Sequence, residues 1–179
     1  MLELEIPSRE LFDDDTQEFR TVKGMVLRLE HSLVSMAKWE SKWKKPFLSY
    51  VKKTRAEETD YFRCMTISQN VDPEIYHALT NTERQKIRDY MDDSMTATTF
   101  YELKKQPPSK DTLTAEVIYY LMFSYQIPKE CEKWHLNRLL TLIRVFNVRN
   151  STTKMSKAEI LAHNRKLNKA RRAARNTRG

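Results

Sequence analysis

The sequence predicts a mainly α (α+β) domain that begins with a β-hairpin and is followed by a basic helical extension. Three observations carry this prediction. Apolar residues alternate with a period of two as far as residue 29, and then recur with the helical period of 3.6. Capping boxes, at 54–57, 80–83 and 156–159, begin three of the helical segments. The formal net charge of +8 lies in residues 151–179, which hold nine basic residues and one acid, so we expect a neutral domain at 1–150 and a cationic tail at 151–179.

Two N-terminal segments carry strand patterns. Residues 2–6 alternate leucine or isoleucine with glutamate, and Pro7 ends the alternation, as in a short half-buried strand. Residues 19–29 repeat the pattern around Gly24, the only glycine before the C-terminal residue. We therefore expect a β-hairpin in this second segment, with its turn at Gly24.

Helix signals fill the middle of the chain. An apolar stripe at helical spacing predicts a helix at 32–45, which ends before Pro46. Capping boxes at 54–57 and 80–83 begin helices that run to about residues 68 and 92. Asp72 precedes a proline in the first helical position, where a missing N–H costs nothing. The clearest internal break is the pair of prolines within 106–109.

Two further helices are expected to form the core of the domain. The segment 111–126 is apolar nearly all round between Val117 and Phe123, which is typical of a buried central helix. A second helix follows Pro128, and its apolar stripe fits a partner packed against the first. The stripe consists of Leu136, Leu139, Leu140, Ile143 and Phe146.

Composition excludes several classes of protein. Two glycines cannot supply the glycine-rich loop of a P-loop or Rossmann nucleotide site. Two cysteines, Cys64 and Cys131, are too few for a disulfide framework and indicate buried thiols in a reducing compartment. No basic segment followed by an apolar one begins the chain, and the longest apolar stretch, 117–123, is too short to cross a bilayer. We expect a soluble, cytoplasmic protein with no membrane contact.

No residue pattern marks a catalytic or metal site. Cys131 and His135 are four residues apart and could face one side of a helix, but zinc needs three or four ligands. Nothing near Cys64 marks a nucleophile and its base. The adjacent acids at 13–15, 57–58 and 92–93 lie where caps or solvated turns favour negative charge. We therefore predict no enzymatic activity, no cofactor and no metal.

The segment 38–45 interleaves lysines with two tryptophans. This composition suits a surface on which nucleic-acid bases stack. Trp43, however, lies in the apolar stripe, and lysine stems often flank a buried tryptophan, so the core interpretation is favoured. Trp39, Trp43 and Phe47 are also the aromatic residues that we expect near a groove for a protein partner.

The tail is the strongest interaction signal. Its apolar set is thin, so we expect a helix that becomes ordered on a partner. Arg171, Arg172 and Arg175 could neutralise phosphates, with an affinity that falls steeply as salt rises. They could equally pair with acids on a protein, or simply keep a solvated terminus soluble. The sequence leaves these three alternatives open.

Several motifs resemble a family of small proteins from the tail-gene cluster of long-tailed bacteriophages, of the tail assembly chaperone type. The resemblance spans most of the chain. It is carried by LEHSLVSMAKWESKWKKPFL at 29–48, QNVDPEIY at 69–76, MTATTF at 95–100, ECEKWHLNRLLTLIR at 130–144, KMSK at 154–157 and NRKLN at 164–168.

The resemblance implies a non-catalytic role in tail assembly, in the cytoplasm of the bacterial host. It implies a chaperone that coats the tape-measure protein, holds it soluble, helps to recruit the tail-tube protein, and is absent from the finished particle. The residues themselves fit this role through a neutral helical body, a groove for an amphipathic helix and a tail that folds on binding. Two alternatives remain: a nucleic-acid-binding protein that uses the basic arm, and a structural component of the virion.

Overall fold

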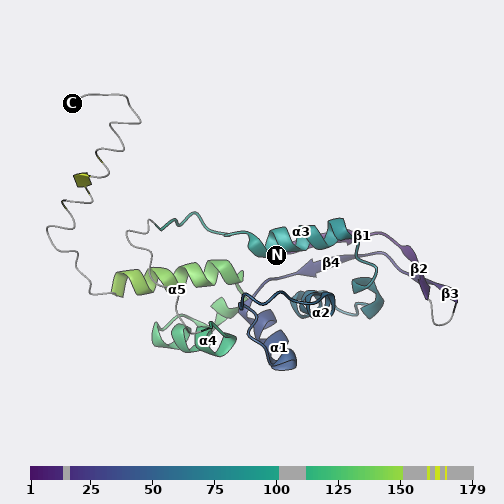
Figure 1. Ribbon diagram of the computed structural model, residues 1–179, viewed down its shortest axis with the longest axis horizontal. Helices are drawn as coiled ribbons and strands as arrows, with labels where there is room; N and C mark the ends of the chain where they lie inside the picture. Colours follow the sequence, from purple (N-terminus) through teal and green to yellow (C-terminus); the bar gives the residue numbers. More distant parts are fainter. Residues whose placement is uncertain (14–16, 101–111, 151–160, 162–163, 166–167, 169–179) are drawn as a thin grey trace. The chain divides into compact units, whose positions relative to one another are not determined.

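Figure 1 shows the computed structural model, which describes residues 1–13, 17–100, 112–150, 161, 164–165 and 168. The chain divides into two units, Met1–Val145 and Phe146–Gly179. Three parts of the sequence interpretation lie outside the described residues. These are the proline break at 106–109, the capping box at 156–159, and the arginines Arg171, Arg172 and Arg175 of the tail.

The fold is mainly helical with an N-terminal β-hairpin, which confirms the predicted class. The hairpin consists of β1 (Leu2–Ile6), β2 (Arg9–Asp13), β3 (Glu18–Val22) and β4 (Met25–Leu29). Antiparallel pairing joins β1 to β4 and β2 to β3, so the four strands form one long, interrupted two-stranded ribbon. Its inner positions, among them Leu27 and Leu29, face the core.

The predicted turn at Gly24 is wrong. The ribbon reverses between β2 and β3, and Gly24 lies at the interruption between β3 and β4, opposite the first two strands. A Cβ atom at Gly24 would lie 2.6 Å from the backbone nitrogen of Ser8 and 2.8 Å from the carbonyl oxygen of Ile6. The glycine therefore permits a close approach of two backbones rather than a reversal of the chain.

The helix starts in the middle of the chain are confirmed. The elements are α1 (Leu33–Trp43), α2 (Arg55–Met65), the 3₁₀ helix η1 (Pro73–Tyr76) and α3 (Asn81–Asp92). Both capping boxes are present with reciprocal hydrogen bonds, at the starts of α2 and α3. The carboxylate of Asp72 caps η1 by accepting a hydrogen bond from the Glu74 N–H at 3.0 Å.

The prediction of a buried central helix at 111–126 is wrong. The segment forms α4 (Ala115–Ser124), which buries a single stripe of Ala115, Ile118 and Met122. The opposite side is exposed: Val117 by 40 %, Tyr120 by 68 % and Phe123 by 65 %. An apolar sequence all round a helix predicts burial only where the fold supplies neighbours on every side, and α4 packs on one side against α1.

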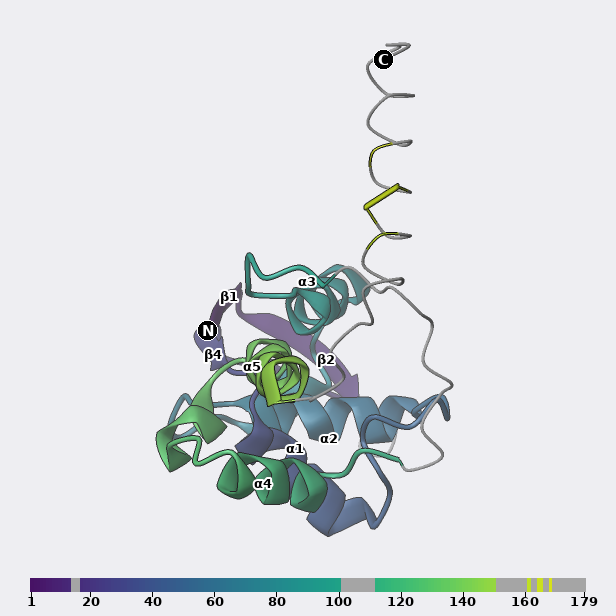
Figure 2. The same cartoon turned by 90° about the vertical axis from the view of Figure 1, so that its left-hand side faces the viewer.

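The core is organised around α1 rather than around a pair of C-terminal helices. Figure 2 shows α1 between α2 and α4, and α1 packs against both. The chain after Pro128 forms the 3₁₀ helix η2 (Lys129–Lys133), and α5 (Leu136–Asn150) begins only after His135. Strand β4, helices α1 to α5 and η2 each contribute at least one side chain to the core: Leu27, Leu29, Leu33, Met36, Phe62, Ile87, Ile118, Cys131, Leu136 and Leu139.

Glu40, a buried acid of α1, fixes the start of α4. Its carboxylate accepts one hydrogen bond from the N–H of Phe47 at 2.6 Å and another from the N–H of Ala115 at 2.8 Å. The second contact satisfies an N–H at the start of α4, where a negative charge also complements the helix dipole. Among the helices that the structure describes, none is long and apolar enough to span a membrane.

Candidate functional site

An exposed apolar face lies on α4. Val117, Tyr120 and Phe123 are three residues apart along the helix, so their side chains share one side of it. All three are more than a third exposed. We call these three residues the α4 face. A helix that presents an apolar stripe of this kind can pair with the apolar side of another helix.

Only one of the three predicted partner-binding aromatics reaches the surface. Trp39 is 1 % exposed and its indole N–H donates to the carbonyl oxygen of Glu57 at 2.9 Å. Phe47 is 5 % exposed, with its ring centroid 3.9 Å from that of Tyr61. Both are therefore core residues in this conformation. Trp43 is half-buried.

Two of the four lysines in the same segment form ion pairs with acids of α2. Lys42 pairs with Asp60, which also accepts a hydrogen bond from the Trp43 indole at 2.9 Å. Lys45 pairs with Glu57 at 2.6 Å. The hydrogen bond from Lys45, followed by that from the Thr54 backbone, lowers the pKa of Glu57 to about 2. These contacts hold the end of α1 against α2 and occupy two of the cations that a nucleic-acid surface would use.

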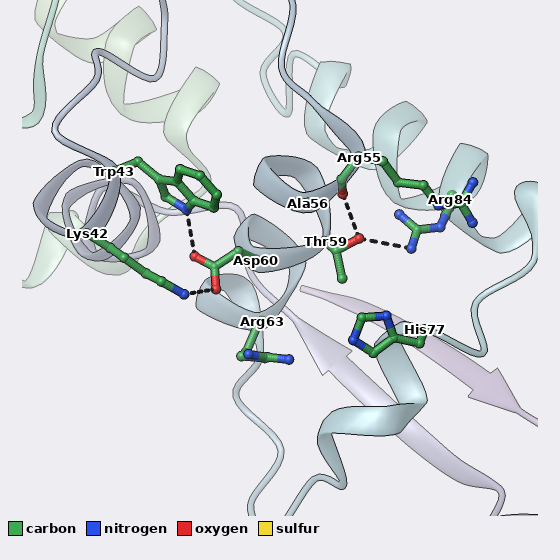
Figure 3. Close-up of a pocket in the computed structure, with 9 residues that line it drawn as sticks. All are labelled: Lys42, Trp43, Arg55, Ala56, Thr59, Asp60, Arg63, His77 and Arg84. Carbon is green, nitrogen blue, oxygen red and sulfur yellow. Dashed lines mark hydrogen bonds and ion pairs between the residues drawn. The ribbon is translucent and has the colours of Figure 1, made fainter. Parts of the chain in front are cut away.

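A charged groove of about 450 Å³ opens beside Trp43 (Figure 3). One side of α2 forms its floor, because residues at 55, 56, 59, 60 and 63 fall on one face of a helix. The end of α1, the residue after η1 and the start of α3 complete the walls. The lining residues are Lys42, Trp43, Arg55, Ala56, Thr59, Asp60, Arg63, His77 and Arg84.

Arg84 is the buried wall of this groove, with 2 % of its side chain exposed. Its guanidinium donates to the hydroxyl of Thr59 and the carbonyl of Tyr76, both at 3.0 Å, and pairs with Glu58 at 3.0 Å. Its buried Nε has no hydrogen-bond partner among the residues that the structure places. Burial, and next the nearby guanidinium of Arg55, lower the pKa of Arg84 below its usual value.

A second polar cluster is buried in the core. His31 Nδ1 lies 2.6 Å from the Tyr61 hydroxyl, and His135 Nε2 lies 3.0 Å from the carbonyl oxygen of Tyr90. Burial, and next the neighbouring His135, lower the pKa of His31 to about 3, and burial lowers that of His135. Both imidazoles are therefore neutral at neutral pH. They join α2, α3 and the entries to α1 and α5, which is a structural role.

Cys131 and His135 do not share a helix face. Cys131 lies in η2, and His135 lies between η2 and α5 with its Nε2 against a backbone carbonyl. Within the described ranges no three His, Cys, Asp or Glu side chains converge as metal ligands. Burial raises the pKa of both the Cys64 and the Cys131 thiols, which opposes the thiolate that nucleophilic chemistry requires.

No family model, curated protein or solved structure matches this chain. We therefore infer function from the residues and their geometry. The α4 face could have been found from sequence, because Val117, Tyr120 and Phe123 have the spacing of one helix side. The groove could not, since Arg84 and His77 reach it from segments that only the fold brings to α2.

Proposed function

We propose that this chain is a non-catalytic protein-binding module that acts as a phage tail assembly chaperone for the tape-measure protein. The α4 face is the observation that carries the proposal. It presents two aromatic side chains and a valine on a helix whose opposite side is fixed in the core. Such a preformed stripe suits an amphipathic helix of a long helical cargo. The sequence resemblance supplies the identity of that cargo.

Rigid support makes the α4 face a good docking surface. Ile118 and Met122 on the opposite side of α4 are buried in the core, and the Glu40 carboxylate fixes the first turn of this helix. A partner therefore loses little affinity to ordering of the site. The α4 face is small, so each copy of this chain would bind only weakly. A long partner would therefore be bound by many copies of the chain along its length rather than at one tight site.

Co-expression with the tape-measure protein of the same tail-gene cluster tests the proposal. We expect the full chain to keep the tape-measure protein soluble, and to co-purify with it whether or not the lysate is treated with nuclease. Tyr120→Glu/Phe123→Glu should abolish this effect, because it places two charges in the apolar contact. Asn81→Glu/Thr82→Glu is the matched control, since it adds the same charge at two exposed positions of α3.

The outcomes separate clearly. A tape-measure protein that stays insoluble with the wild-type chain would contradict the chaperone role. Equal solubility with the α4 double variant and the wild type would remove the α4 face from it. Recovery of the tail-tube protein in the same complex would support the further role in recruiting tube subunits.

Nucleic-acid binding through the tail is the second candidate function. The observation that favours it is the concentration of nine basic residues in 151–179, Arg171, Arg172 and Arg175 among them. A cationic arm of this kind neutralises phosphates and releases counterions. The arm is then the active part and the α4 face is irrelevant to binding, which makes the two candidates separable by mutation.

A further inference from the structure

Positive charge gathers at the two ends of the groove in Figure 3. At one end the Arg55 guanidinium lies beside that of Arg84, close enough to lower its pKa. At the other end Arg63 and Lys42 both act on Asp60. Glu58 pairs with Arg84, and Asp60 pairs with Lys42. Arg55 and Arg63 have no carboxylate partner of their own within the part of the chain that the structure covers.

The spacing of these two arginines is fixed by α2. They are eight residues apart on one helix, which separates their Cα atoms by ~12 Å along its axis. Thr59 lies between them on the groove floor, as does the Asp60 carboxylate. The groove therefore offers two cationic positions with an acid between them, rather than one continuous cationic track.

This pattern disfavours a nucleic-acid strand. In a duplex each strand carries a phosphate about every 3.4 Å along the axis. A strand long enough to reach both Arg55 and Arg63 would hold phosphates against Asp60. A partner with only two acids, one opposite each arginine, places no negative charge against Asp60 and so avoids that repulsion. A helical partner places such acids two turns apart, at a separation of ~10.5 Å.

We propose that this groove binds an acidic helix of a partner protein, in which two carboxylates two helical turns apart pair with Arg55 and Arg63. The inference rests on the proposed protein-binding function and adds the chemistry of a segment that would bind there. The half-buried Trp43 ring borders the groove and gives the apolar stem of an acidic side chain a surface to pack on.

NMR titration of the ¹⁵N-labelled full chain tests this site. The probe is a capped helical peptide rich in alanine and glutamine, with two glutamates two turns apart. We expect it to shift the backbone amide signals of Arg55 and Arg63 and the Trp43 indole signal. A peptide of the same composition with its glutamates one turn apart should bind about twofold to fivefold more weakly, because it can engage only one arginine at a time.

Variants assign the contact. Arg55→Gln and Arg63→Gln should each weaken binding of the two-turn peptide about twofold to fivefold, the range of an exposed ion pair. They should also make the two peptides equivalent. Lys86→Gln is the matched control, because it removes one positive charge from an exposed position of α3 outside the groove. The dispersion of the amide spectrum checks that each variant is folded.

Three results would overturn the inference. One is equal affinity for the two peptides in the wild-type chain, and another is unchanged affinity in both arginine variants. The third is a short oligothymidine that shifts the same signals at lower concentration than the peptide, which would indicate a phosphate site. The α4 variant Tyr120→Glu/Phe123→Glu should retain peptide binding, so failure of the groove and failure of the chaperone proposal are distinguishable.

Discussion

The imidazole of His135 lies edge-on to that of His31, with ring centroids 5.1 Å apart and ring planes inclined by 71°. Both rings are buried, and one nitrogen of each ring forms a hydrogen bond with an uncharged group. The partner of His31 is the Tyr61 hydroxyl, and that of His135 is the backbone carbonyl of Tyr90. A proton on either ring would place a charge beside the other inside the core. The pair is therefore stable only while both rings are neutral.

We expect acid to destabilise the protein through these histidines. Their pKa values are lowered in the folded state, to about 3 for His31, whereas an unfolded histidine titrates near its usual value of about 6.5. The unfolded chain therefore binds more protons below about pH 6.5, and stability falls with pH from there. His31 alone should contribute a loss of about 2 kcal/mol between about pH 6.5 and 5.

Urea unfolding at several pH values in this range measures the effect. His31→Gln, which keeps a hydrogen-bonding group near Tyr61, should lower stability at neutral pH and flatten the slope. The control is His77→Gln, because His77 is exposed in the groove wall. If the slope of the wild-type protein persists in His31→Gln, another group is responsible for it.

The Glu83 carboxylate should also stabilise the fold, and its contribution should be lost at a lower pH than that of the two histidines. Arg9 of β2 donates two hydrogen bonds to Glu83, at 2.7 and 2.8 Å, and a third to the carbonyl of Ala78 at 2.7 Å. Contact with Arg9, and the cap formed with Thr80, lower the pKa of Glu83 to about 2. Its contribution is therefore present above about pH 4.5 and lost as pH falls towards 2.

Substitution of Glu83 measures this contribution. Glu83→Gln keeps an oxygen for the capping box but loses the charge-assisted pair, and we expect a loss of about 1 kcal/mol at neutral pH that disappears near about pH 2. Glu116→Gln, at an exposed position in the first turn of α4, is the control for loss of one negative charge. A loss in Glu83→Gln that is independent of pH would indicate a packing defect instead.

Gly24 should tolerate no side chain. The Cβ of an alanine would meet backbone atoms of Ser8 and Ile6, which cannot rotate out of the way. Relief requires the paired strands to separate, so Gly24→Ala should cost about 1–3 kcal/mol, the range for overpacking. Lys23→Ala, at the exposed neighbouring position, should change the melting temperature little. A variant with wild-type stability would show that the interruption of the ribbon is pliable.

The parts of the fold that the sequence predicts correctly are those encoded by local chemistry. Capping boxes begin α2 and α3 because the side chain and backbone groups that satisfy each other lie three residues apart. Strand pairing is not local. The alternation at 19–29 is genuine, but only the fold shows that β4 pairs with β1, and that Gly24 therefore lies against Ser8 instead of in a turn.

The candidate sites follow the same division. The sequence pattern places Trp43 and Phe47 in one helical stripe, but only the fold shows that Phe47 stacks on Tyr61 in the core while Trp43 stays half-buried. Phe123 is expected in the core because its helix is apolar nearly all round, but the fold leaves its side chain exposed. The role of Arg84 could not be recognised from the sequence, because its partners Glu58 and Tyr76 belong to α2 and η1, which only the fold brings next to it.

Removal of the tail tests whether it contributes to the stability of the domain and to nucleic-acid binding. The basic residues of 151–179 follow the end of α5 at Asn150, and the described core residues all lie before Val145. We therefore expect deletion of residues 152–179 to leave the melting temperature almost unchanged. If the arm binds nucleic acid, the deletion should also abolish an affinity for DNA or RNA that falls steeply with salt. A large drop in melting temperature would show that the tail stabilises the domain, and unchanged nucleic-acid binding would place that activity outside the arm.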